Sequence, residues 1–288
     1  MRKRLFPYLM ILPSMLIFAV FYMASIGYMI YLSFTDWNFI SAEKKFVGLD
    51  NFKLLLQDQR FLQTLSNTTI YTVCTVFFTI VIALLLAIWI NKKGKIYEFT
   101  QNAIFSPHII SLVSVSMLWM WIMDYDYGLL NQILEIFGME PVGWLTDSRI
   151  VIYSLVVVSV WKSVGYYTLI FIAGLQSIPD SIYEAAALDN ASTMRRLFKI
   201  TLPMLSPTIF FVGITSVIAC FKVFETISIM TQGGPANASN TIVYYIYEYG
   251  FRFFKIGQAS AAGIILLIVI SIFTFIYFKL MSKRVFYR

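Results

Sequence analysis

Long apolar stretches along this chain are separated by short polar segments. A bilayer core of about 30 Å is crossed by roughly 20 helical residues, and each apolar stretch is long enough to do so. The pattern therefore predicts six membrane-spanning helices. The predicted spans are 7–34, 65–90, 103–123, 150–174, 204–230 and 259–280.

Composition supports a membrane protein and adds little else. Of the 288 residues, 59% are hydrophobic and 13% are charged, whereas a soluble domain carries about a quarter charged residues. We expect a single all-α domain over 1–288. Cys74 and Cys220 lie inside apolar stretches, which favours packing roles over a disulfide. His108 is the one histidine, so no cluster with metal-ligand spacing is predicted.

The net charge of +7 first suggests nucleic acid, but its distribution predicts topology instead. With an even number of spans and both termini cytoplasmic, the inner segments carry most of the basic residues. The inner basic residues are Arg2, Lys3, Arg4, Lys92, Lys93, Lys95, Arg195, Arg196, Lys199, Lys279, Lys283, Arg284 and Arg288, against Glu98, Asp180, Glu184 and Asp189. The outer segments balance or reverse sign. We therefore predict cytoplasmic termini and no nucleic-acid partner.

The first apolar stretch opens with basic residues, as a signal peptide does. Its apolar run is too long for a signal peptide and no small-residue cleavage site follows, so we expect it to remain as an anchor. Among the outer segments, TQGGP after the fifth span predicts a turn, with a plain solvated loop as the alternative. The segment LDNFKLLLQDQRF predicts a surface helix with Phe52, Leu55 and Leu56 on one side.

The inner connection 176–203 reads QSIPDSIYEAAALDNASTMRRLFKITLP. SIYEAAAL predicts a short helix that is broken at Asp189 and Asn190. A second helix is predicted over STMRRLFKI, with Ser192 as N-cap and its end before Pro203. This helix-turn-helix is too polar to span a bilayer and too apolar for an idle linker. It should dock on a partner, or lie in the membrane interface as an amphipathic pair.

The same segment resembles the signature of ABC importer permeases, which is EAA, three residues, Gly, nine residues, Ile, one residue and Leu-Pro. Matching positions are Glu184, Ala185, Ala186, Ile200, Leu202 and Pro203. Asn190 replaces the usual glycine, and asparagine tolerates the left-handed conformation better than most residues. The stretches VGLDNFKLLLQDQRFLQTLSNTTIYT, AGLQSIPDSIYEAA and TQGGP are similar to the carbohydrate branch, of the maltose type that depends on a binding protein.

The resemblance implies a multi-pass subunit of a bacterial cell membrane that forms half of a sugar pathway. Implied partners are a second homologous permease, a cytoplasmic ATPase dimer that binds ATP and Mg²⁺, and an extracellular solute-binding protein. This chain has no nucleotide-binding motif, so no cofactor or enzymatic activity is expected of it. The residues implied to couple it to the ATPase are Glu184, Ala185, Ala186, Asp189, Asn190, Leu202 and Pro203.

A pathway for sugars needs hydroxyl partners and aromatic faces. Ser159, Lys162, Ser163 and Tyr166 follow one helical face of the fourth span. The fifth span offers a similar face, and the resemblance adds His108, which is otherwise a helix-start residue near the inner interface. The other candidates are Ser216, Cys220, Lys222 and Glu225.

Lys162 facing lipid would cost at least ~2.5 kcal/mol. Three roles stay open: an ion pair with Glu225, a separate Lys222–Glu225 pair that leaves Lys162 to protein or water, or contact with a charged or polar substrate. Glycerol phosphate is therefore the alternative substrate to a neutral sugar.

A stand-alone secondary transporter would need coupling-ion sites or repeats, and a membrane enzyme would need clustered His or carboxylates. Neither pattern is clear in the sequence.

Overall fold

The computed structural model describes residues 2–281 and is almost entirely helical; Lys283, Arg284 and Arg288, used above for topology, lie outside the described residues. The elements in chain order are α1 (Arg2–Phe18), η1 (Ala19–Met23), α2 (Ala24–Ser33), β1 (Thr35–Asp36), β2 (Lys45–Phe46), α3 (Asp50–Gln57), α4 (Gln59–Ile90), α5 (Lys95–Ile109), α6 (Leu112–Ile122), α7 (Leu129–Ile136), α8 (Val151–Gln176), α9 (Asp180–Leu188), α10 (Thr193–Arg196), η2 (Leu197–Thr201), α11 (Leu202–Met204), α12 (Ser206–Phe221), α13 (Glu225–Met230), α14 (Ile242–Tyr247), η3 (Glu248–Arg252) and α15 (Ile256–Met281). The η segments are π-helical turns.

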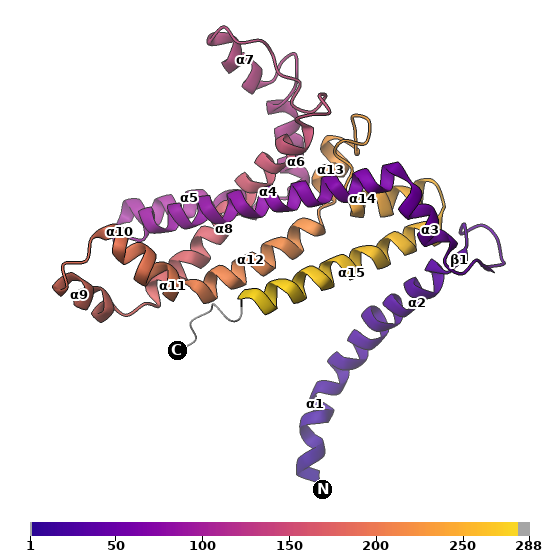
Figure 1. The fold of residues 1–288 in the computed structure, drawn as a ribbon, viewed down its shortest axis with the longest axis horizontal. Coiled ribbons are helices and arrows are strands. Elements are labelled where there is room, and N and C mark those ends of the chain that lie inside the picture. Colours follow the sequence, from indigo (N-terminus) through magenta and orange to yellow (C-terminus); the bar gives the residue numbers. More distant parts are fainter. Residues whose placement is uncertain (1, 282–288) are drawn as a thin grey trace. The chain divides into compact units, whose positions relative to one another are not determined.

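The prediction of an all-α membrane bundle is confirmed, with one change of shape. Five helical segments are long and apolar enough to cross a membrane, and they coincide with five of the predicted spans: Tyr8–Ser33, Gln59–Ile90, Val151–Gln176, Ser206–Met230 and Ile256–Lys279. The remaining span is a bent pair, because α5 and α6 differ in direction by 97°. The prediction of one uninterrupted helix over 103–123 is therefore wrong. Figure 1 shows α6 and α7 turning away from the direction shared by α5 and α8.

The described chain divides into two compact units, one of which comprises residues up to Leu62 together with Tyr245–Val269. In this unit β1 pairs antiparallel with β2, Thr35 opposite Phe46. The Asn51 side chain in α3 donates to the backbone carbonyls of Ser33 and Thr35, at 2.8 and 2.9 Å. A side chain at Gly257 would collide with the Thr35 carbonyl, so the start of α15 lies directly on this strand.

The expected surface helix is only partly observed. Helix α3 ends at Gln57, and α4 begins two residues later at Gln59 rather than at the predicted residue 65. The predicted apolar side also divides, since Leu55 is buried and Leu56 is exposed. The short α3 therefore packs against its own unit through part of that side.

Two tyrosines of 245–249 bind Asp58, the residue just before α4. The hydroxyls of Tyr245 and Tyr249 both donate to Asp58 Oδ2, at 3.2 and 3.3 Å, and their rings stack with centroids 4.0 Å apart. Burial raises the pKa of both phenols. Both therefore stay neutral donors to the carboxylate over the physiological range.

The second unit comprises Gln63–Tyr244 together with the chain from Ile270 onward. Its core lies between α4, α8 and the start of α12, where Ala83 and Ala87 are fully buried beside Phe171 and Leu205. Small residues such as these let membrane helices approach closely. Gly213 in α12 does the same for α15, because a side chain there would collide with the Tyr277 hydroxyl.

The TQGGP segment forms a turn, as predicted, with the amide of Gly234 donating to the Thr231 carbonyl at 2.9 Å. Within TQGGP, Gly233 is buried and Gln232 is exposed, so the turn is partly open to solvent. Ser239, Asn240 and Thr241, a few residues later, are buried. The Asn67 side chain in α4 donates to the carbonyls of residues 237 and 240, at 2.8 and 3.1 Å. Polar residues of an apolar span thus hold this loop in place.

Candidate functional site

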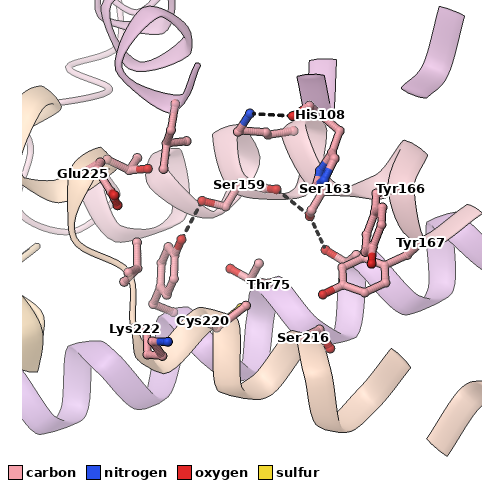
Figure 2. Close-up of a pocket in the computed structure, with 17 residues that line it drawn as sticks. Thr75, His108, Ser159, Ser163, Tyr166, Tyr167, Ser216, Cys220, Lys222 and Glu225 are labelled. Atoms are coloured by element: carbon pink, nitrogen blue, oxygen red, sulfur yellow. Dashed lines mark hydrogen bonds between the residues drawn. The ribbon is translucent and has the colours of Figure 1, made fainter. Parts of the chain in front are cut away.

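A cavity of about 460 Å³ lies in the second unit, between α4, α8, α12, α13 and the bend of the third span. Side chains from these elements face one another across it (Figure 2). All nine residues predicted to form a substrate pathway line this cavity: His108, Ser159, Lys162, Ser163, Tyr166, Ser216, Cys220, Lys222 and Glu225. The structure brings these residues together, while their roles stay predictions.

A row of hydroxyls runs along one wall of the cavity. Tyr71 Oη lies 2.6 Å from Ser159 Oγ, and the Ser163 hydroxyl donates to the Ser159 carbonyl at 2.7 Å. Thr79 Oγ1 lies 3.4 Å from Ser163 Oγ. Tyr71, Thr75 and Thr79, which were not among the predicted pathway residues, line the cavity from α4. The signal was present, since these residues follow one another at four-residue spacing inside an apolar span.

Aromatic rings form a second part of the wall. The ring of His108 stacks on that of Tyr166, with centroids 4.5 Å apart and planes at 10°. Tyr167 meets Tyr166 edge to face, with centroids 5.2 Å apart. The alternative for His108, a residue at a helix start near the inner interface, is wrong because α5 begins at Lys95 and His108 is its last residue but one. A stacked aromatic pair beside hydroxyls is suited to the apolar face of a sugar ring.

Of the roles left open for Lys162, the ion pair with Glu225 is not formed within residues 2–281, the side chain contacts protein backbone instead, and contact with a substrate stays a prediction. Its ammonium donates to the carbonyl oxygens of Pro107, His108 and Ile110, at 3.2, 3.3 and 2.6 Å. No ion pair joins Lys162 to Glu225 within residues 2–281, because the bend of the third span offers unpaired carbonyls closer by. The ion-pair interpretation is corrected accordingly.

Lys222 and Glu225 are also unpaired with each other in the described part of the chain. The predicted pairing assumed one continuous helix, on which residues three apart are neighbours. The fifth span instead breaks between Phe221, the end of α12, and Glu225, the start of α13. Both charged side chains are exposed at the cavity.

The connection 176–203, called the coupling segment below after the role that the resemblance implies, folds largely as predicted. Helix α9 ends at Leu188, and Asn190 adopts the left-handed conformation with φ 51°, as the substituted glycine position requires. The Ser192 hydroxyl caps α10 by accepting from the amide of Arg195 at 3.3 Å.

The predicted helix end before Pro203 is wrong. The chain passes through the π-helical turn η2 and stays helical from Leu202 to Met204. In η2 the Leu202 amide donates to the Leu197 carbonyl. Such a widened turn has room for a proline ring that an α-helix interior excludes.

The two short helices leave a hollow of about 510 Å³ on the coupling segment. Its floor includes Ala185 and the buried Ala186, and its rim includes Asp189 and the basic Arg195. Glu184 is exposed beside it, whereas Leu202 and Pro203 are half-buried at the junction with α12. Leu188, Met194 and Phe198 are exposed large apolar residues on the same segment. The surface therefore has the exposed apolar residues and the space that docking requires.

Residues 59–287 match the family described as binding-protein-dependent transport system inner membrane component. The chain belongs to this family. The match begins at Gln59, the first residue of α4, and includes both the cavity and the coupling segment. The chain is thus a multi-pass membrane permease component of an ABC transporter.

Two curated relatives cover almost the whole permease. A probable ABC transporter permease protein, YurN, from Bacillus subtilis (strain 168) is 34% identical over 93% of this chain and 93% of its own length. The sn-glycerol-3-phosphate transport system permease protein UgpA from Agrobacterium fabrum (strain C58 / ATCC 33970) is 32% identical over 99% of this chain and 97% of its own length.

Solved structures agree with the fold. A chain of a bacterial alginate ABC transporter, crystallised in complex with an alginate pentasaccharide-bound periplasmic protein, superposes with a TM-score of 0.85 at 25% identity and covers 98% of the permease. A chain of the MetNI methionine ABC transporter has a TM-score of 0.56 at 16% identity and supports the fold alone.

Proposed function

We propose that this permease carries a neutral sugar or oligosaccharide through the cavity between α4, α8 and α12. The observation that carries the proposal is the lining of the cavity, a row of hydroxyls from Tyr71 to Thr79 beside the stacked rings of His108 and Tyr166. A sugar presents hydroxyls and an apolar ring face, and both find partners here. The volume lies within the range of small-molecule sites. The alginate transporter imports an acidic polysaccharide, so it supports a saccharide as the substrate class, while the choice of a neutral one rests on the cavity lining alone.

The permease works as half of a pathway in a bacterial inner membrane, with a second homologous permease. A pair of cytoplasmic ATPase subunits binds ATP and Mg²⁺ and docks on 176–203, where Glu184 meets a basic residue and the hollow over Ala185 and Ala186 receives a partner side chain. An external solute-binding protein delivers the substrate, as a periplasmic protein does in the alginate complex. Movement of the ATPase reaches the cavity through α8 and α12, which flank the coupling segment.

Glycerol phosphate is the second candidate, favoured by the similarity to UgpA proteins. Its phosphate would need a cation in the cavity. The three donors of Lys162 are directed at backbone carbonyls, and the charge of Lys222 is balanced by Glu225 on the same wall. The lining keeps one net positive charge, that of Lys162, but the donors of this ammonium are already engaged, which favours an uncharged polyhydroxyl solute over an anion.

The test measures which solute shifts the melting temperature of the cognate binding protein, and then ATP-driven uptake of that solute by the complete transporter in vesicles. We expect a neutral sugar to raise the melting temperature and to accumulate. Selective stabilisation and uptake of glycerol phosphate would favour the second candidate. Uptake by the permease without the ATPase would contradict an ABC mechanism.

A further inference from the structure

The bend of the third span leaves backbone carbonyls without helical partners. Helix α5 ends at Ile109, and the next two residues are extended, with ψ near 140° (141° at Ile110 and 136° at Ser111), before α6 begins at Leu112. Pro107 lies in the last turn of α5 and has no N–H to donate. The last carbonyls of a helix have no donors within it, and at membrane depth such groups need other partners.

Lys162 supplies those partners from the middle of α8. Its ammonium has three N–H donors, and three carbonyl oxygens at the bend accept from it, those of Pro107, His108 and Ile110. The charge also lies at the negative end of the α5 dipole. Three donors of the ammonium thus meet three carbonyl acceptors, and its positive charge lies at the helix end where the dipole favours a cation.

Two neighbours of Lys162 on α8 also contact α5. A side chain at Gly165 would stand 1.9 Å from the carbonyl oxygen of Ile104, so the backbones of α8 and α5 are in direct contact one turn away. Tyr166 stacks on His108, the residue whose carbonyl Lys162 binds. Residues 162, 165 and 166 of one helix thus hold the end of another.

We propose that Lys162 is a positioning residue that holds the third span in its bent form and thereby keeps the ring of His108 on the cavity wall. An anionic substrate would have to displace three carbonyls to reach the ammonium, so the charge serves the protein backbone rather than the cargo. The consequence for uptake rests on the proposed function. The consequence for the bend does not.

The experiment measures the bend directly in the assembled transporter. Spin labels are placed at Phe99 on α5 and Met117 on α6, two exposed positions, in a background with Cys74 replaced by Ser. From a rise of about 1.5 Å per residue, the two backbone positions are roughly 18 Å apart when bent and roughly 27 Å apart in a continuous helix. Pulsed electron paramagnetic resonance resolves this difference.

We expect Lys162→Met to lengthen or broaden the distance distribution and to lower sugar uptake about tenfold or more, since hydrogen bonds of a charged donor are lost. Lys162→Gln keeps two N–H donors and should fall between Met and the wild type in both measurements. Lys53→Met, on an exposed outer helix, is the matched control and should change neither.

The order of the two variants keeps the inference testable if Lys162→Met does not assemble, because Gln should then still assemble and keep the short distance. A role in filling space predicts the reverse order, since methionine matches the length of lysine better than glutamine does. That reverse order, or wild-type distances in both variants, would overturn the proposal. Wild-type distances with a changed choice of substrate would assign Lys162 to the cargo instead. If the wild type carries no sugar, the proposed function fails while the distance measurement still decides the role of Lys162.

Discussion

The coupling segment and the cavity are built by different kinds of contact. In 176–203 the conformation is set by neighbours in sequence: Ser192 caps the helix that it begins, and Asn190 turns the chain by its own φ. In the cavity each side chain is placed by a partner far along the chain, as Tyr71 is by Ser159 and His108 by Tyr166.

Because the two regions are built by different contacts, they should tolerate different substitutions. A local element should tolerate changes that keep its turn and cap, and should fail when the residue that meets a partner protein changes. The cavity should be most sensitive where two helices touch, because a misplaced helix moves several wall residues at once.

Reversing the charge of Glu184 should uncouple the permease without unfolding it. We expect Glu184→Lys to insert normally, to lose co-purification of the ATPase and to lower ATP-driven uptake at least about tenfold, because a like-charge contact replaces an ion pair at the interface. The carboxylate is exposed and makes no hydrogen bond or ion pair with another residue of 2–281 that the change would break.

Glu140→Lys, an identical change in the predicted outer segment, is the control and should leave assembly and uptake near wild type. Normal uptake and normal ATPase assembly in Glu184→Lys would contradict the docking role. Poor insertion of both variants would indicate that net charge, rather than docking, limits the protein.

Gly165→Ala tests the contact between α5 and α8. The added carbon would stand 1.9 Å from a backbone oxygen, which cannot rotate away, so the helices must separate. We expect a destabilisation of about 1–3 kcal/mol, typical of overpacking, seen as a lower melting temperature of the purified complex and reduced uptake. Gly27→Ala is the matched control, because nothing lies within 4 Å of its added carbon; a similar loss there would remove the argument from close approach.

Much of the fold follows from the sequence because hydrophobic length and local signals fix it. The six predicted spans coincide with five single segments and one bent pair, and the second helix of the coupling segment begins with the predicted cap. The nine candidate pathway residues gather at one cavity because helical spacing puts them on shared faces. Periodicity within one helix is enough for that step.

What the sequence did not reveal depends on contacts between segments. Both Pro107 and Pro203 can be read in the sequence, but whether a proline bends a span or is accommodated in it depends on its surroundings. Pro107 lies just before the bend, whereas Pro203 follows a π-helical turn and the chain stays helical. The backbone partners of Lys162 could not be predicted for the same reason, since these carbonyls are exposed only by the bend. Charge alone suggested another side chain, while the three-dimensional path of the backbone provided the acceptors.

Substitution of Tyr166 tests the role of the aromatic rings in the cavity wall, and this prediction rests on the proposed function. We expect Tyr166→Ala to raise the KM for sugar uptake about fivefold, because stacking of one ring contributes about 1 kcal/mol. Tyr166→Phe keeps the ring and should stay within about twofold of the wild type. Equal effects of Ala and Phe would assign the role to the hydroxyl, and an unchanged KM in both would remove the ring from the pathway.

Asn190→Gly should have the smallest effect of these changes, and its comparison with Asn190→Val tests whether the turn is set by local conformation. The φ of 51° at Asn190 is open to glycine without strain. Asn190→Gly should therefore shift stability by no more than about 0.5 kcal/mol, since relief of the left-handed conformation is offset by the greater freedom of glycine in the unfolded chain. Asn190→Val should cost about 1–2 kcal/mol, because a β-branched side chain clashes in that conformation.

The pair is compared by the melting temperature of the complex and by ATPase co-purification. If the segment is a locally built docking element, Asn190→Gly should keep the melting temperature and the ATPase co-purification, and Asn190→Val should lower both. The KM for uptake should stay unchanged in the fraction of complexes that assembles. Equal tolerance of Gly and Val would mean that the ATPase, rather than the turn, shapes this segment. The contrast between local and long-range construction would then hold for the cavity alone.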